Sequence, residues 1–234
     1  MAVAYDNSST AELAGDSSKT FSHTVTGSDL ILIVFAFIDQ TGNSVSSVTY
    51  NGENLTFLAT ANQSGNGEIE AWYLINPSTG ANNVVLTMSA GSNGGVSATS
   101  LTGIDVRDPI RSYTTGTGAT SSSSVTYDRN NSSSGVLVID GLVMNGFNSG
   151  DGTNMSGVPS SSQTERLDFK CDQWQRGLVS TKQVTDGNTT MSWTLSGGTL
   201  QGWASVAIVL NPRRELIPPT KSLRPAIFTG GIAR

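Results

Sequence analysis

Short runs of apolar residues recur along the whole chain, and most have the lengths and turn-rich borders that are typical of β-strands. Glu68–Ile75 alternates apolar and polar positions, as expected of a strand with one buried face. Leu30–Ile38 is continuously apolar, which indicates a strand buried on both faces, and Val136–Met144 is a second long apolar strand. The pattern predicts strands over Phe21–Val25, Leu30–Ile38, Ser47–Tyr50, Leu55–Thr60, Glu68–Ile75, Val84–Met88, Val96–Ile104, Val125–Tyr127, Val136–Met144, Thr164–Phe169, Leu178–Val184, Met191–Leu195 and Trp203–Leu210.

Two halves of the chain resemble each other. Residues 79–104 and 186–210 both run turn, strand, Ser-Gly-rich turn, strand, and Leu30–Ile38 matches Val136–Met144. Asn51-Gly52 adds a hairpin-turn signal, because both residues tolerate positive φ. One half has too few strands to bury both faces of its sheets. We therefore predict an all-β fold, a two-sheet antiparallel β-sandwich of jelly-roll type built from two similar halves, rather than two separate small barrels.

The domain organisation follows from these repeats and from two unusual segments. Residues 1–211 form the predicted β-sandwich body, with similar halves at about 1–113 and 125–211. The Ser/Thr/Gly-rich stretch Thr114–Ser124 between them fits a linker, and it equally fits a strand plus loop that crosses between sheets.

Residues 212–234 differ in kind and are predicted to form an extended, Pro-rich, basic C-terminal arm. Pro218, Pro219 and Pro225 forbid a helix there and favour an extended chain. Apolar residues are frequent in the arm, although a solvated linker would not need them. We expect the arm to dock on its own body, on a neighbouring copy or on another protein. Its predicted contact residues are Arg213, Arg214, Leu216, Ile217, Leu223, Arg224, Ile227, Phe228 and Ile232.

Charge separates the arm from the body. The net charge is −5 and only 13% of the residues are charged. The arm is basic, with a single acid at Glu215, so the body is more acidic than the whole chain. An acidic body argues against nucleic-acid binding, which requires a basic face. The composition, rich in Gly, Ser and Thr, suits strands joined by tight turns better than long helices.

Targeting and redox signals are sparse. The first ten residues have neither the basic region nor the apolar core of a signal peptide, and Leu30–Ile38 is too short to span a bilayer. We therefore expect synthesis in a host cytoplasm without a signal peptide, and no membrane partner. A single cysteine, Cys171, cannot form an internal disulfide.

Residues that could support catalysis or metal binding do not form a recognisable set, so we expect no enzyme, no metal and no cofactor. The one histidine, His23, is expected on a strand near the surface without a nucleophile elbow. Glu68 and Glu70 share a strand face, which is more typical of a solvated sheet than of a glycosidase pair. Loop carboxylates that could contribute to a calcium site are Asp105, Asp108 and Asp151, without EF-hand spacing.

Tryptophans leave carbohydrate binding open as an alternative. Trp193 and Trp203 lie in alternating strand patterns and are expected in the core. Trp174, in the polar segment CDQWQRG, is the better exposed candidate for a glycan contact, followed by Trp72.

Several segments together resemble a known group of proteins: AVAYDNSST, KTFSHTVTGSDLILIVFAF, VSSVTYNGENLTFLATA, EIEAWYLINPSTGANNVVLTMS and ATSLTGIDVRDPIRS. They resemble a family of phage-encoded and prophage-encoded β-sandwich proteins found among virion structural genes. The resemblance covers about residues 2–112, and the repeat extends it to about 211. It brings no catalytic residues, and it implies a capsid decoration or head-fibre type of accessory virion protein.

The leading hypothesis is therefore a virion structural protein, a capsid decoration or cement protein that stabilises the shell through its C-terminal arm. Its expected partners are other copies of itself and a major capsid protein, and its expected location is the virion. The alternative is a carbohydrate-binding or adhesion module on a virion or cell surface.

Overall fold

The computed structural model describes residues 1–39, 45–63, 67–127, 134–184 and 189–214. Within these residues the regular structure is β-strand, apart from one turn of helix, α1 (Asp151–Asn154). The prediction of an all-β protein is confirmed. The predicted hairpin turn is also present, because Asn51 and Gly52 have φ values of 51° and 80° and join β4 (Val45–Tyr50) to β5 (Glu53–Asn54).

The first half of the chain, here the N-half, folds into two antiparallel sheets over its described residues. The N-inner sheet contains, in spatial order, β1 (Ala4–Glu12), β9 (Gly94–Thr102), β3 (Ile31–Ile38), β7 (Glu68–Ile75) and β6 (Thr56–Asn62). The N-outer sheet contains β2 (Ser18–Val25), β8 (Gly80–Met88), β4 and β5.

The second half, here the C-half, repeats this arrangement in the described residues. The C-inner sheet contains, in spatial order, β10 (Ile110–Gly118), β17 (Leu200–Leu210), β12 (Val136–Gly146), β15 (Gln175–Val184) and β14 (Thr164–Lys170). The C-outer sheet contains β11 (Ser122–Tyr127), β16 (Thr189–Ser196) and β13 (Ser156–Pro159). The two inner sheets have the same strand order, counted from the first strand of each half, once the two-residue β5 of the N-half is left out of the count.

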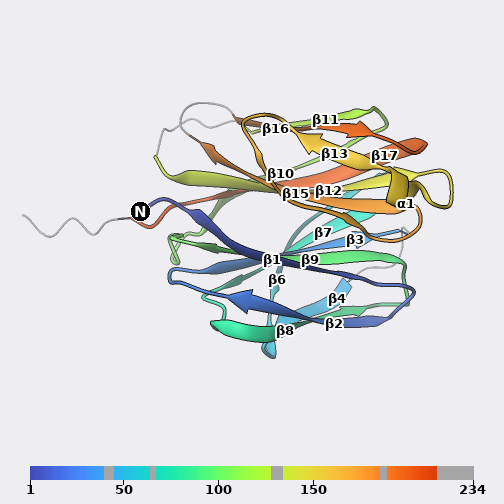
Figure 1. Cartoon of the computed structure of the whole chain (residues 1–234). Coiled ribbons are helices and arrows are strands. Elements are labelled where there is room, and N and C mark those ends of the chain that lie inside the picture. The colour runs from blue at the N-terminus through green and yellow to red at the C-terminus, as the bar shows by residue number, and fades with distance from the viewer. Residues whose placement is uncertain (40–44, 64–66, 128–133, 185–188, 215–234) are drawn as a thin grey trace, which may run out of the picture.

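The sheets stack as layers, with the two inner sheets face to face at the centre of the molecule (Figure 1). The expected β-sandwich is confirmed, but the described strands form four sheets rather than the expected two. The reason is visible in β3 and β12, which are buried along their whole lengths. A strand of a two-sheet sandwich buries one face only, whereas a strand in a central layer buries both. The jelly-roll type stays a prediction.

The segment Thr114–Ser124 is not a linker. It contains the second part of β10, a turn, and the start of β11, so the chain crosses from the C-inner to the C-outer sheet there. The strands of the C-half accordingly begin at Ile110, before the expected position 125.

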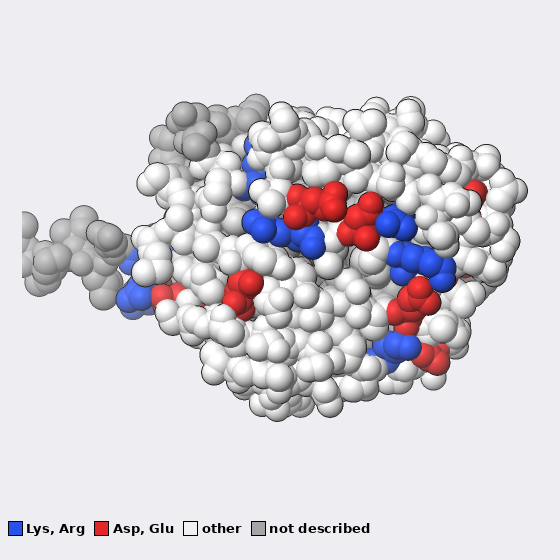
Figure 2. Space-filling view, viewed as in Figure 1, with Lys and Arg blue, Asp and Glu red and all other residues white. Residues whose placement is uncertain are grey.

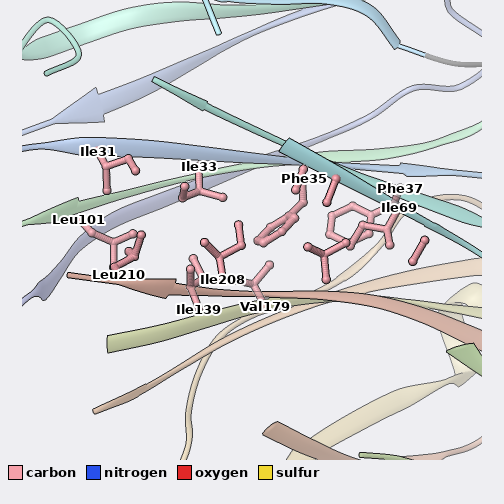
Figure 3. Close-up of a cluster of buried hydrophobic side chains, with 14 of the residues drawn as sticks. Ile31, Ile33, Phe35, Phe37, Ile69, Leu101, Ile139, Val179, Ile208 and Leu210 are labelled. Atoms are coloured by element: carbon pink, nitrogen blue, oxygen red, sulfur yellow. The ribbon is translucent and has the colours of Figure 1, made fainter. Parts of the chain in front are cut away.

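The apolar core between the inner sheets, here the junction core, joins the halves. In Figure 3 the side chains of β3 point toward those of β12 and β17 across this core. Its labelled members are Ile31, Ile33, Phe35, Phe37, Ile69, Leu101, Ile139, Val179, Ile208 and Leu210. Each fully buried side chain of this size contributes about 1.5–3 kcal/mol, so the junction core makes the halves one body.

A large residue faces a small one at the centre of the junction core. Ile31 pairs with Leu101 in the N-inner sheet, and Leu137 pairs with Leu210 in the C-inner sheet, so Phe35 and Gly141 occupy equivalent positions. A Cβ atom on Gly141 would lie 2.8 Å from Cγ of Phe35. The ring of Phe35 therefore requires a glycine at the matching position of the other half.

Candidate functional site

A groove opens on the surface where the two halves meet. This junction groove has a volume of about 290 Å³ and is lined by Glu12, Ala14, Asn93, Lys170, Asp172, Gln173 and Trp174. Figure 2 shows the charged side chains of one face gathered in a band across the junction, while the outer layers on that face are nearly uncharged. Since both halves supply its walls, the groove exists only when they are packed together.

The hairpin turn between β14 and β15 forms the C-half wall of the groove. Oδ1 of Asp172 accepts hydrogen bonds from the backbone N–H groups of Trp174 and Gln175, each at 2.7 Å. The carbonyl of Gln173 accepts the N–H of Gly150 at 2.8 Å, from the loop that leads into α1. These bonds hold the turn, and the tryptophan on it, in one conformation.

A tight turn between β1 and β2 forms part of the N-half wall. Ala14 and Gly15 have φ values of 52° and 84°, and the N–H of Asp16 donates to the carbonyl of Leu13 at 3.0 Å, as in a type I′ turn. The N–H of Gly15 also donates to the carbonyl of Ser92 at 3.1 Å. The wall is therefore fixed by backbone hydrogen bonds before any ligand is present.

Carboxylates dominate the electrostatics of the groove. Glu12 pairs with Lys170 across the junction at 3.2 Å, and both side chains are about half exposed. Asp172 is only 6% exposed, and burial raises its pKa. Burial, reinforced by the charge of Asp172, also raises the pKa of Asp39 to about 6. Oδ2 of Asp172 is buried and finds no hydrogen-bond partner within the described chain.

The two tryptophans that were candidates for glycan contact have different surroundings. Trp174 is half-buried, lines the junction groove, and belongs to none of the apolar clusters found among the described residues. Trp72 packs against the apolar core of the N-half and contacts the edge of Phe57 at 5.3 Å between ring centroids. Trp193 and Trp203, expected in the core, are both buried.

The expectation that His23 lies near the surface is wrong, because its side chain is only 1% exposed. Its Nδ1 lies 3.0 Å from Oγ of Ser9 and its Nε2 lies 3.1 Å from Oγ of Ser100, which in turn donates to Asp6 at 2.7 Å. Burial lowers the pKa of His23 to about 4, so the imidazole is neutral near pH 7. The hydroxyl groups satisfy the ring, which gives it a structural role.

Glu68 and Glu70 share one face of β7, as expected, but each is engaged separately. The expected solvated face is wrong for Glu70, which is buried. Glu70 accepts hydrogen bonds from the N–H of Val45 and from Nε1 of Trp72, both at 2.9 Å. Burial raises its pKa. Glu68 accepts a hydrogen bond from Oγ1 of Thr60 on the neighbouring strand at 2.9 Å.

The loop carboxylates considered for calcium lie apart in two groups. Asp105 and Asp108 pair with Arg214, and Asp151 accepts the N–H of Asn148 at 2.8 Å. Across the described ranges, no group of three or more His, Cys, Asp or Glu side chains is placed to hold a metal ion. No helix of the described chain is long and apolar enough to cross a membrane.

Comparison with known proteins leaves the family open. No protein-family model and no curated protein matches the chain. The solved structure of a candidate secreted protein from Eubacterium rectale is similar at 12% identity, over 87% of this chain and 74% of that chain, with a TM-score of 0.27. A likeness of this size carries no argument about function.

The predicted arm residues lie only partly within the described chain. Arg213 and Arg214 are described, and both are bound to the body. The other predicted contact residues lie outside the described residues: Leu216, Ile217, Leu223, Arg224, Ile227, Phe228 and Ile232.

Trp174 could be identified from the sequence, but most of the residues that line the groove around it could not. Lys170 and Glu12 are 158 positions apart, and no local pattern connects them. The duplication was the one available signal, because two packed halves must have a junction with an edge.

Proposed function

We propose that this protein is a non-enzymatic structural protein of a phage virion, a capsid decoration protein that stabilises the shell through its C-terminal arm. Its partners are other copies of the chain and a major capsid protein. The resemblance in residues 2–112 supports the virion setting, and the layered β-sandwich supplies a stiff body with short connections.

The observation that carries the proposal is the anchored root of the arm. Pro212 forms a β-bridge with Ile104, and the N–H of Arg213 donates to the carbonyl of Gly103 at 2.8 Å. The guanidinium of Arg213 pairs with Asp29 at 2.7 Å. The arm therefore leaves the body from a fixed point, so a force on the arm passes into the backbone of the N-half.

Ion pairs of Arg214, the next residue, add to this attachment of the arm to the body. Arg214 pairs with Asp105 at 3.2 Å and with Asp108 at 3.1 Å. Each exposed pair contributes little energy alone, at most about 1 kcal/mol. Their common effect is to hold the C-terminal end of the C-half against the loop that leaves the N-half.

The arm sequence after Arg214 contains apolar residues that could be buried on a partner, together with prolines that stiffen the chain. Burying apolar anchors such as Ile227, Phe228 and Ile232 on a partner would contribute about 1.5–3 kcal/mol each. The prolines limit the freedom of the unbound arm, which lowers the entropic cost of ordering it. Repetition over many copies on a shell would multiply this effect.

The test uses particles of the phage that encodes the chain, grown without it. Purified full-length chain and a chain ending at Arg214 are added back, and the bound protein is measured after sedimentation of the particles. We expect the full-length chain to bind and to raise the temperature at which the particles release DNA. The shortened chain should remain folded and fail to bind.

Substitutions within the arm sharpen this test. The triple variant Ile227→Ser, Phe228→Ser, Ile232→Ser should lose binding, whereas the control Thr220→Ala, Ser222→Ala should keep it. Equal binding of the shortened chain would contradict the role of the arm, and absence of the full-length chain from particles would contradict the virion role.

A further inference from the structure

The junction groove has features that packing alone does not require. Four polar side chains line a hollow of about 290 Å³ there: Glu12, Asn93, Lys170 and Gln173. Trp174 stays half-buried beside it, on a turn held by backbone hydrogen bonds. A preformed hollow that combines an aromatic side chain with a few polar groups is the usual form of a small-ligand site.

The side chains that line the junction groove include both hydrogen-bond donors and hydrogen-bond acceptors. Glu12 supplies a carboxylate acceptor, Lys170 supplies an ammonium donor, and Asn93 supplies an amide. Oγ of Ser149 donates to Oε1 of Gln173 at 2.9 Å, which leaves the NH₂ of that amide as its remaining polar group. A metal cation would use only the acceptors, and an anion only the donors.

Hydroxyl groups are the ligand chemistry that uses both kinds of partner, because each is a donor and an acceptor. A sugar ring presents several of them around its rim and an apolar face that can lie on an aromatic ring. The carboxylates of Glu12 and Asp172, with Asp39 nearby, would repel an acidic sugar. The volume of about 290 Å³ is at the small end for ligand pockets, which favours a short glycan over a long one.

We propose that the junction groove binds a neutral saccharide, with one sugar ring on Trp174 and a hydroxyl group that donates to the carboxylate of Glu12. Lys170, Asn93 and Gln173 donate to the other hydroxyl groups. This binding activity does not depend on the assembly role of the arm, since the groove lies entirely within the described body.

The experiment probes the purified full-length chain with an array of neutral and acidic glycans, followed by saturation-transfer NMR with each neutral glycan that binds. Trp174→Ala should weaken binding about tenfold or more, because the aromatic face is lost. Glu12→Gln keeps the size of the side chain and replaces one carboxylate oxygen by an amide NH₂, so it should weaken binding while the fold is unchanged.

Phe147→Ala is the matched control, since it removes an aromatic side chain that is 61% exposed and does not line the groove. It should bind glycan like the unaltered chain, and thermal unfolding should show that all the variants are folded. The proposal is overturned if no neutral glycan on the array binds, if only acidic glycans bind, or if binding survives Trp174→Ala. None of these results would affect particle binding through the arm.

Discussion

The two halves share one strand order but fill equivalent buried positions differently. Val34 of the N-half pairs with Ala98, and Asp140 of the C-half pairs with Ala207, so the two residues occupy matching places in β3 and β12. Val34 packs in the apolar core between the N-half sheets. Asp140 lies in the corresponding interior of the C-half, only 3% exposed.

Each half contains a buried ionisable side chain whose polar atoms have hydrogen-bond partners on other strands. Asp140 accepts a hydrogen bond from Nε1 of Trp193 at 2.8 Å and another from the hydroxyl of Ser180. The N-half instead buries His23 between two serine hydroxyl groups. The comparison shows that the strand order tolerates exchange of an apolar residue for a charged one, provided that hydrogen-bond partners are built around it.

The largest effect is expected where the halves meet. Phe35→Ala should lower the free energy of unfolding by about 3–5 kcal/mol, because it opens a cavity over Gly141 in the junction core. Denaturant unfolding measures this change, with Phe147→Ala as an exposed control. A loss below about 1 kcal/mol would mean that the inner sheets are not packed as described.

The N-half should lose stability in acid. The pKa of His23 falls from the ordinary 6.5 to about 4 on folding, so the unfolded chain binds the proton first. Stability is full above pH 6.5 and falls as the pH drops toward 4, by roughly 2–3 kcal/mol from this group. His23→Gln should remove that loss, measured as the difference in unfolding free energy between pH 7.5 and 4.5. An unchanged difference would contradict the buried, neutral imidazole.

The C-half should instead lose stability as the pH rises. Burial raises the pKa of Asp140 from 3.8 to about 6, so its contribution to stability is full below pH 3.8 and is lost as the pH rises through 6. The loss between pH 4.5 and 7.5 should be about 2 kcal/mol. Asp140→Asn should abolish it, while lowering stability at pH 4.5 because an amide nitrogen cannot accept from Trp193. A variant with the unaltered pH dependence would show that Asp140 is not the group that titrates.

Much of the fold could be predicted because buried strand positions are occupied by apolar residues in a regular pattern along the sequence. The continuous apolar run of Leu30–Ile38 predicted a strand buried on both faces, and β3 is one. The number of layers was not predicted, although the same run contained the information, since only a central sheet buries both faces.

The candidate site was less predictable, because it depends on tertiary packing. Trp174 was identified from its polar neighbours, but its partners Glu12 and Asn93 come from the other half. The burial of His23 was missed as well, since its hydroxyl partners Ser9 and Ser100 lie on other strands. Neither set leaves a local pattern.

Electron cryo-microscopy of particles carrying the full-length chain would show whether this protein decorates a shell and binds it through its arm. We expect Ile227, Phe228 and Ile232 to be buried against another chain, either a second copy or the major capsid protein. If these side chains pack on their own body or face solvent on a decorated particle, binding through the arm is contradicted.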